Sequence, residues 1–386
     1  MGILMPHISE CKIENYKKLD TFILKDIGRI NLITGDNNIG KTTLLESLLV
    51  NDNLLYSINF IHKMLCERGI HAHLPVTSKK SDLLIPDYFK KYILNNSAAP
   101  LIINYKLKDG SRDDITIFSK KLSELSEIES RQIRKFDYDK LKDVPYYFVQ
   151  YINNTLKEVQ PYYLDDLERK HNDFLLYWPF IWPNTEYSPD LHEFYLKVQL
   201  DNKFSNLNID KRDLLIEYLQ LFDNRIEKVE LIKFEENSIL GVLTRGNKNF
   251  FPITRMGSGF IRYFRIVLEL LYIDSKDGLE TRFFIDEIDN GIHFTKMKGL
   301  WKSIFELVLR TNIQLFVTTH SLECLESYAI VANEFEDLKS HIRQIELEEI
   351  IQDGKSRLIS STYSLDLIQS GLDSGINLRG GDLWRN

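Results

Sequence analysis

The chain has 386 residues, 43% of them apolar, which is enough for one large or two modest domains with a hydrophobic core and excludes disordered, collagen-like or small disulfide-bonded proteins. The formal charge of −7 makes any contact with nucleic acid local or indirect. Three widely spaced cysteines indicate a reducing compartment. Because we find neither a signal peptide nor an apolar run of roughly 18 to 20 residues, we expect a cytoplasmic protein without membrane contact.

The first fifty residues predict strands that lead into a helix. Short apolar runs at residues 8–13, 22–27 and 30–33 are typical of strands. Directly after a glycine turn, the leucines of residues 41–50 recur at helical spacing. A strand, a glycine turn and a helix in direct succession form the setting of a phosphate-binding loop. We therefore take residues 1–50 as the first lobe of a head domain.

The character of the sequence changes in residues 51–209, which we interpret as an insertion. Apolar runs on both sides of Asp109-Gly110 predict a β-hairpin, and the mixed-charge stretch 119–143 predicts exposed helices. Residues 145–182 are dense in aromatic side chains, which indicate either a small core or a surface that stacks on bases or contacts a protein. We expect a mostly helical lid or interaction region.

Regular periodicity returns in residues 210–386, the second part of the head. Helices are predicted at residues 213–222, 261–272 and 296–309, and strands at 228–234, 239–244, 283–285 and 314–318. The succession of strand, helix and strand at the end of this series implies a parallel pair. After His320 the sequence predicts a strand, a turn at Asp353-Gly354, a second strand and a short helix.

Residues 35–43 match the pattern G-x-x-x-x-G-K-[ST] without departure. The two glycines let the backbone turn its amide groups around an anion. Lys41 places a cation at the β- and γ-phosphates of ATP, and Thr42 offers a hydroxyl to Mg²⁺. The predicted nucleotide-binding residues of this loop are Gly35, Asn37, Asn38, Gly40, Lys41, Thr42 and Thr43.

The buried strand predicted at residues 283–285 ends in two acids, Asp286 and Glu287. Asp286 would hold Mg²⁺ through a water molecule, and Glu287 would orient or deprotonate the water that attacks the γ-phosphate. Because acidic residues are common at strand ends, this pair alone does not predict a nucleotide site. It does so only together with the phosphate loop. Together the two motifs predict an ATPase with Lys41 and Glu287 as catalytic residues and ATP and Mg²⁺ as cofactors.

The order of these motifs resembles that of ABC-type ATPases of the SMC, RecF and OLD-like branch. The run Met256-Gly257-Ser258-Gly259, which begins a predicted helix, resembles the degenerate signature of that branch. In the family this loop reaches the nucleotide of a second subunit, which implies that Ser258 and Gly259 bind the γ-phosphate held by a partner copy.

Two further segments share the resemblance. His320 follows the strand predicted at 314–318 and is similar to the switch histidine, which implies a catalytic role at the γ-phosphate. Residues 289–293 resemble the D-loop. A glutamine loop cannot be placed, since neither Gln150 nor Gln160 has a matching context. This lack, with the unorthodox signature, disfavours the engine of a membrane transporter.

The resemblance implies an α/β fold, namely a P-loop ABC-type ATPase head with a mixed sheet and an inserted, mostly helical lid domain. It also implies a homodimer or higher homo-oligomer that closes head to head on ATP and hydrolyses it slowly. By analogy with stand-alone OLD-like ATPases of prokaryotic defence gene pairs, such a protein senses or regulates a separate effector, a nuclease or toxin.

The 66 residues after His320 are too few for the toprim nuclease domain of OLD nucleases, so we expect the partner to act as the effector. The alternative is a RecF- or SMC-like DNA-binding ATPase of DNA repair or maintenance. Arg255, Arg262 and Arg265 flank the signature-like run and are either a basic patch near the nucleotide or a nucleic acid, or solvated or internally paired side chains.

Overall fold

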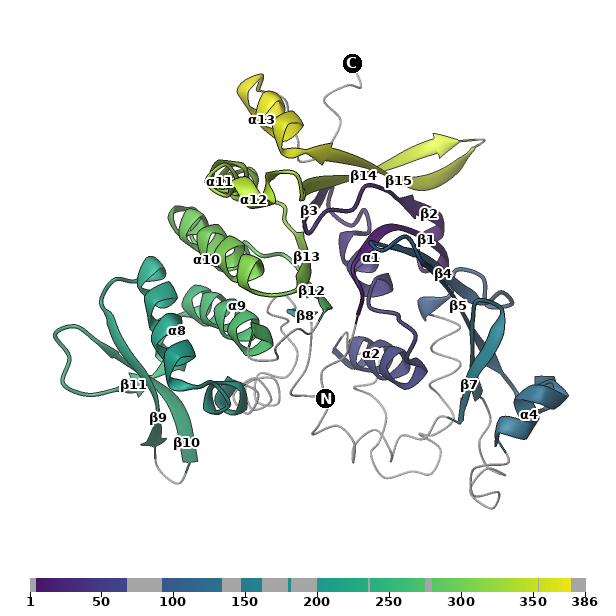
Figure 1. The fold of residues 1–386 in the computed structure, drawn as a ribbon, viewed down its shortest axis with the longest axis horizontal. Coiled ribbons are helices and arrows are strands. Elements are labelled where there is room, and N and C mark those ends of the chain that lie inside the picture. The colour runs from purple at the N-terminus through teal and green to yellow at the C-terminus, as the bar shows by residue number, and fades with distance from the viewer. Residues whose placement is uncertain are drawn as a thin grey trace.

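The computed structural model describes residues 5–67, 92–133, 147–161, 180–181, 200–234, 237–274, 280–352 and 354–375. In these residues two six-stranded sheets and one three-stranded sheet are combined with helices (Figure 1). The fold is therefore α/β with mixed sheets, as the sequence predicts. Across the same ranges, every helix is too short or too polar to cross a membrane.

The central sheet has the strand order β15-β14-β3-β13-β12-β8 and is parallel except for β15. Its strands are β3 (Ile30–Gly35), β8 (Phe180–Ile181), β12 (Thr281–Ile285), β13 (Ile313–Thr318), β14 (Ile342–Gln352) and β15 (Lys355–Ser364). The predicted parallel pair is confirmed, since Phe284 lies opposite Phe316. Every residue of β3, β12 and β13 is buried, as expected of parallel strands covered on both faces.

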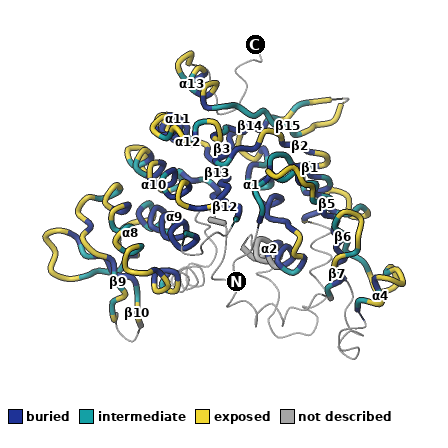
Figure 2. The backbone as a smooth tube through the Cα atoms, in the orientation of Figure 1, coloured by how far each residue is buried: buried dark blue, intermediate teal, exposed yellow. Residues whose placement is uncertain are grey.

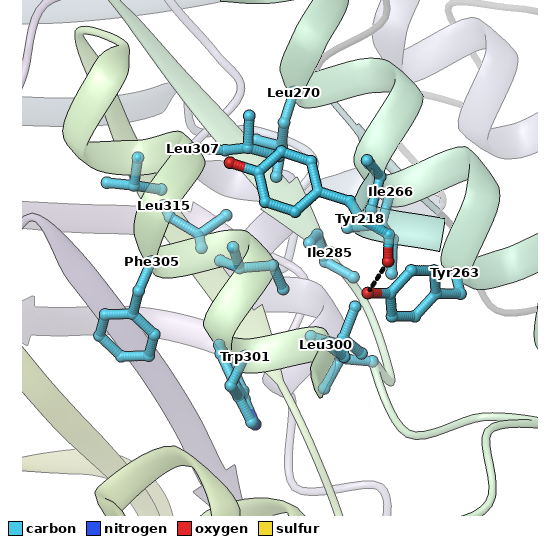
Figure 3. Close-up of a cluster of buried hydrophobic side chains, with 14 of the residues drawn as sticks. Tyr218, Tyr263, Ile266, Leu270, Ile285, Leu300, Trp301, Phe305, Leu307 and Leu315 are labelled. Atoms are coloured by element: carbon cyan, nitrogen blue, oxygen red, sulfur yellow. Dashed lines mark hydrogen bonds between the residues drawn. The ribbon is translucent and has the colours of Figure 1, made fainter. Parts of the chain in front are cut away.

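Side chains that alternate along these strands pack into two different cores. Phe283 and Ile285 face a core formed with α8 (Ile209–Phe222), α9 (Ser258–Asp274), α10 (Met297–Arg310) and α11 (Leu322–Ala332). Figure 3 shows this core, in which the Tyr263 hydroxyl donates to the Tyr218 carbonyl at 2.9 Å. Phe284 faces the opposite core, which includes the leucines of α1 (Lys41–Ser47). Strands β3, β12 and β13 of the central sheet thus form the buried middle layer (Figure 2).

The second six-stranded sheet is antiparallel and has the order β2-β1-β4-β5-β6-β7. Its strands are β1 (Ile8–Tyr16), β2 (Leu19–Leu24), β4 (Leu101–Leu107), β5 (Arg112–Lys120), β6 (Tyr147–Ile152) and β7 (Thr155–Pro161). The hairpin predicted around Asp109-Gly110 is confirmed by the β4–β5 pair. Hydroxyl groups of β15 join the two sheets at their edges: Ser360 Oγ donates to the Ile23 carbonyl at 3.0 Å and Thr362 Oγ1 to the Lys25 carbonyl at 2.9 Å.

The prediction of a mostly helical lid is wrong for the described part of residues 51–209. Helices α2 (Leu54–Glu67), η3 (Leu122–Glu124) and α4 (Glu127–Ile133) are present, but four strands of the insertion extend the antiparallel sheet from β1. The helices predicted in the mixed-charge stretch 119–143 are present in its described part as η3 and α4, but strands on both sides of that stretch pair into the sheet. Residues 134–146, and most of the aromatic residues predicted to form a core or a binding surface, lie outside the described residues.

The second half of the chain follows the predicted periodicity with one exception. A three-stranded sheet of β9 (Ile226–Phe234), β10 (Asn237–Thr244) and β11 (Phe251–Pro252) lies beside α8, and α12 (Glu336–Lys339) and α13 (Leu365–Asp373) accompany the β14–β15 hairpin. Short 3₁₀ turns, η4 (Ile253–Met256) and η5 (Phe294–Lys296), precede α9 and α10. The sequence did not predict α11. Its apolar residues are nearly continuous because most of the helix is buried.

Candidate functional site

The predicted site residues meet at one edge of the central sheet. Strands β3, β13 and β12 are parallel, so their carboxyl ends lie on the same side. The phosphate loop follows β3, His320 follows β13, and Asp286 with Glu287 follows β12. The fold therefore brings together motifs that are nearly 280 residues apart in the sequence.

The phosphate loop between β3 and α1 turns through left-handed backbone conformations. Gly35, Asn38 and Gly40 have φ angles of 139°, 59° and 125°. A Cβ on Gly35 would lie 2.7 Å from the Leu347 carbonyl oxygen of β14, so only glycine fits there. Lys18 Nζ donates to the Asn38 carbonyl at 2.5 Å. Asn37 and Asn38 are exposed, whereas Thr42 and Thr43 are half-buried in the first turn of α1.

Lys41 is 5% exposed and lies against the loop that precedes it. Its Nζ donates to the carbonyls of Gly35 at 2.7 Å and Asp36 at 2.8 Å, and lies 3.2 Å from His320 Nδ1. Burial lowers the pKa of Lys41 to about 8, although nearby carboxylates, Asp286 first, act to raise it. Partial burial lowers the pKa of His320, and the Lys41 ammonium lowers it further.

Asp286 lies at the centre of the site and is 2% exposed. Its Oδ2 accepts a hydrogen bond from Thr42 Oγ1 at 2.8 Å, and its Oδ1 accepts one from Thr318 Oγ1 at 2.6 Å. Burial raises the pKa of Asp286 to about 6, while the bonds from Thr318 and Thr42 lower it. The carboxylate is therefore mostly ionised at neutral pH, the form that binds a cation.

The residues present fit a magnesium ion. Thr42 Oγ1 and Asp286 Oδ2 are hard oxygen donors, the kind that Mg²⁺ prefers. Their hydrogen bond of 2.8 Å would let the Thr42 hydroxyl bind the ion while Asp286 holds it through a water molecule. The adjacent phosphate loop and Lys41 would provide the anion-binding half of a Mg-ATP site.

Glu287 is held in an unusual backbone conformation. Its φ angle is 48°, which L-residues with long side chains rarely adopt. The Glu287 N–H donates to Thr318 Oγ1 at 2.7 Å, its carbonyl accepts from Arg262 Nη2 at 2.7 Å, and its Oε2 accepts from Asn290 Nδ2 at 3.3 Å. Three neighbours from different elements thus fix both the backbone and the carboxylate of the predicted catalytic residue.

The signature-like run lies beside the D-loop-like segment of the same chain. Gly257, with φ 84°, is followed by Ser258, which is exposed at the start of α9. A Cβ on Gly259 would lie 2.2 Å from the Gly291 carbonyl oxygen. In the described residues, the hydrogen bonds of the site join Lys41, Thr42, Asp286, Glu287 and His320, and none of these bonds includes Ser258 or Gly259.

The predicted patch of three arginines is wrong. Arg255 is exposed, but Arg262 is 3% exposed and donates to the backbone carbonyls of Asp286 and Glu287. Burial lowers the pKa of Arg262 to about 10. The Nε of Arg265 is likewise buried. Internal bonding, the other interpretation of these arginines, is what the structure shows for Arg262.

Neither candidate glutamine is hydrogen-bonded to Asp286 in the described part of the chain. Gln150 is fully buried in β6 and its Nε2 donates to the Asn51 carbonyl at 2.9 Å, whereas Gln160 in β7 donates to Glu158. In the D-loop-like segment, Asp289 Oδ1 accepts from Thr319 Oγ1 at 2.6 Å. Residue spacing revealed neither Arg262 nor Thr318, because both act through side-chain directions that only the fold defines.

Comparison with known proteins agrees with this geometry. A family model described as "AAA domain, putative AbiEii toxin, Type IV TA system" matches residues 30–326. A protein of Helicobacter pylori (strain ATCC 700392 / 26695) named "ATP/GTP phosphatase" is 24% identical over 409 residues, covering 97% of this chain and 100% of that protein.

Solved structures of SMC heads are similar at 12% identity. The SmcHead bound to the C-winged helix domain of ScpA matches 95% of this chain and 100% of its own with a TM-score of 0.49. The SMC head domain from Thermotoga maritima matches 92% of this chain and 99% of its own with a TM-score of 0.43.

Proposed function

The chain belongs to the family described as "AAA domain, putative AbiEii toxin, Type IV TA system" and is an ATPase, and from this premise we propose that two copies close head to head on Mg-ATP. One copy would supply Lys41, Thr42, Asp286, Glu287 and His320 to each site, and the other copy Ser258 and Gly259. Closure on ATP and release after hydrolysis would signal to a separate effector protein.

The observation that carries the Mg-ATP site of each copy is the bond of 2.8 Å between Thr42 Oγ1 and Asp286 Oδ2. It joins the phosphate loop to the acidic strand end at a place suited to Mg²⁺. When bound there, Mg²⁺ supplies positive charge that neutralises phosphate oxygens. Lys41 adds a second cation, and the loop amides orient the phosphates.

Glu287 is the group best suited to prepare the attacking water. Its carboxylate is half-buried beside Asp286, and it accepts a hydrogen bond from Asn290 that restricts its direction. His320 lies next to Lys41 and can report on the same phosphate. Because Lys41, Glu287 and His320 come from one copy, that copy would hydrolyse the ATP held by its own phosphate loop.

Ser258 supports a site shared between copies. It begins a helix of 17 residues, so unpaired backbone amides and the positive end of the helix dipole lie at its position. Ser258 is exposed, and the hydrogen bonds that join the other site residues in the described chain do not include it. A phosphate of ATP bound to a second copy would satisfy these amides.

The proposal includes a separate effector protein that receives the signal. The family description refers to a toxin–antitoxin system, which supports a two-protein arrangement. A nuclease or toxin as partner, and a role in antiviral defence, rest on the resemblance to stand-alone OLD-like ATPases. Arg262 is 3% exposed, so it adds nothing to a basic surface for nucleic acid, but the RecF- or SMC-like alternative rests on the order of motifs and remains open. Co-purification of a second protein expressed from the native operon would favour the sensor role. Salt-dependent DNA affinity that rises with ATP would favour the alternative.

Cross-linking between differently tagged copies tests the shared site. One copy would have Asn38→Cys and the other Ser258→Cys, both in a Glu287→Gln, Cys66→Ser background; the remaining cysteines, Cys11 and Cys324, are buried. A short bis-maleimide should join the two tags only with ATP. A matched pair with Arg131→Cys, exposed on α4, in place of Ser258→Cys should not cross-link. Absent or ATP-independent cross-linking, in a pair of variants shown to bind ATP still, would refute the shared site without affecting the assignment as an ATPase.

A further inference from the structure

We propose that Thr318 is a positioning residue that sets the magnesium ligand and the catalytic carboxylate relative to each other. This inference rests on the proposed roles of Asp286 and Glu287. Thr318 is the last residue of β13 and is fully buried. Its hydroxyl donates to Asp286 Oδ1 at 2.6 Å and accepts from the Glu287 N–H at 2.7 Å.

In these two bonds the Thr318 hydroxyl acts once as a donor and once as an acceptor. Asp286 requires a donor because its ionised carboxylate only accepts, and the Glu287 N–H requires an acceptor. Only a hydroxyl-bearing side chain of this size satisfies both groups at once. A valine of similar shape would leave a buried carboxylate oxygen and a backbone N–H each without this partner.

The backbone of Glu287 explains why such a clamp is needed. A non-glycine residue with φ of 48° is strained, and the strain persists only where the surroundings enforce it. The Thr318 hydroxyl holds the N–H of Glu287, and the Thr318 backbone carbonyl accepts from the next amide, the Ile288 N–H, at 3.0 Å. Without the hydroxyl, Glu287 can relax toward ordinary φ angles and its carboxylate moves.

The position of Thr318 also links this clamp to the rest of the site. It is followed by Thr319, which holds Asp289, and then by His320, which lies at Lys41. The end of β13 therefore contacts the acidic turn and the phosphate loop through three successive side chains. Thr318 acts through Asp286 and Glu287 and is not itself assigned a contact with substrate.

Steady-state kinetics of Thr318→Val and Thr318→Ser test the inference. Thr318→Val should lower kcat about 10- to 100-fold, the effect of displacing a catalytic group by roughly 1 Å, with the KM for ATP within about threefold because Lys41 and its loop are intact. It should also raise the Mg²⁺ concentration for half-maximal rate. Thr318→Ser keeps the hydroxyl and should restore kcat to within about threefold of the parent.

Thr281→Val is the matched control. Thr281 is a buried threonine at the start of β12, whereas Asp286 follows the other end of that strand. It makes the same loss of a buried hydroxyl and should leave kcat unchanged. If Thr318→Val fails to fold, Thr318→Ser and Thr318→Cys decide the question: the weakly bonding thiol should lower kcat and serine should not. Equal rates for serine and cysteine variants would overturn the role.

Glu287→Gln, measured in parallel, separates this inference from the proposed function. If Glu287→Gln is inactive and Thr318→Val has the parental kcat, only the role of Thr318 is refuted. If Glu287→Gln hydrolyses ATP at the parental rate, the assignment of the catalytic carboxylate falls and the inference about Thr318 falls with it.

Discussion

Lys41 Nζ lies 3.2 Å from His320 Nδ1, a contact between residues 279 positions apart in the sequence. An ammonium group has only donors, so Nδ1 must be the unprotonated nitrogen of the imidazole when this bond is formed. The bond therefore selects the neutral tautomer with hydrogen on Nε2. Of these two side chains, Lys41 then has a positive charge and His320 is neutral.

The pKa of His320 is expected to lie below the ordinary 6.5 and to rise in Lys41→Met. Burial is the larger cause of the depressed pKa and remains in the variant, whereas the repulsion by the Lys41 ammonium is removed. Two-dimensional NMR of the imidazole nitrogens over pH 4–8, assigned with His320→Gln, measures both values. A pKa that is unchanged in Lys41→Met would show that the contact does not form.

Asp286 should make the ligand-free protein less stable as the pH rises. Burial raises its folded-state pKa to about 6 from the ordinary 3.8, so the folded protein retains a proton that the unfolded chain has released. The free energy of unfolding should therefore fall between about pH 4 and pH 6, by roughly 3 kcal/mol in total. Urea unfolding should show this loss in the parent and not in Asp286→Asn.

The affinity for Mg²⁺ should increase with pH as Asp286 becomes ionised, whereas the stability of the ligand-free protein decreases. Protonation of Asp286 removes the charge that binds the cation, so the affinity should decline as the pH falls below about 6. Calorimetric titration of Mg²⁺ with nucleotide at pH 5.5 and 7.5 measures this. Equal affinities at the two pH values would exclude Asp286 as a ligand.

Gly259→Ala should destabilise the protein although it lies in a helix. Helix propensity alone favours alanine over glycine by up to about 1 kcal/mol. The new Cβ, however, would lie 2.2 Å from the Gly291 carbonyl oxygen, and relief of such overlap typically costs about 1–3 kcal/mol. Thermal unfolding shows whether Gly259→Ala lowers or raises the stability of the protein. A higher Tm would mean that the signature-like turn does not pack against the D-loop-like segment.

Lys41→Ala should abolish productive nucleotide binding, whereas Lys18→Ala should weaken it only slightly. Both lysines donate to carbonyls of the phosphate loop, but Lys41 is buried, whereas the Lys18 ammonium donates to the carbonyl of the exposed Asn38. Fluorescence titration with a labelled ATP analogue compares the pair at matched stability. Similar losses in the two variants would indicate a structural role of the loop contacts rather than a phosphate contact of Lys41.

Short-range patterns were sufficient to predict much of the head. The glycine-rich loop between β3 and α1, and the parallel pair of β12 and β13, depend on local spacing and on connection rules that a sequence reveals. The strand extension of the antiparallel sheet by the insertion was missed, because pairing of β4 with β1 joins residues about 90 positions apart. Composition contains no information on such a pairing.

The candidate site was predicted in its named motifs but not in its supporting contacts. Lys41, Thr42, Asp286 and His320 were expected from motif order, and the structure places them together. The sequence left open whether Arg262 is a surface charge or is internally bonded, because helical periodicity does not tell whether a long side chain reaches a backbone carbonyl. Thr318 lies in the run that leads to His320, but the sequence assigned it no role, since that role depends on the direction of one hydroxyl at a strand end.

The mass of the Glu287→Gln particle in solution tests the central claim most directly. This variant should bind ATP without hydrolysing it, so light scattering should give the mass of one chain, 45.4 kDa, without nucleotide and at least twice that mass with Mg-ATP. Adding Ser258→Arg should return the ATP-bound particle to a single chain. A Glu287→Gln protein that is saturated with ATP and still has the mass of one chain would contradict a site shared between two copies.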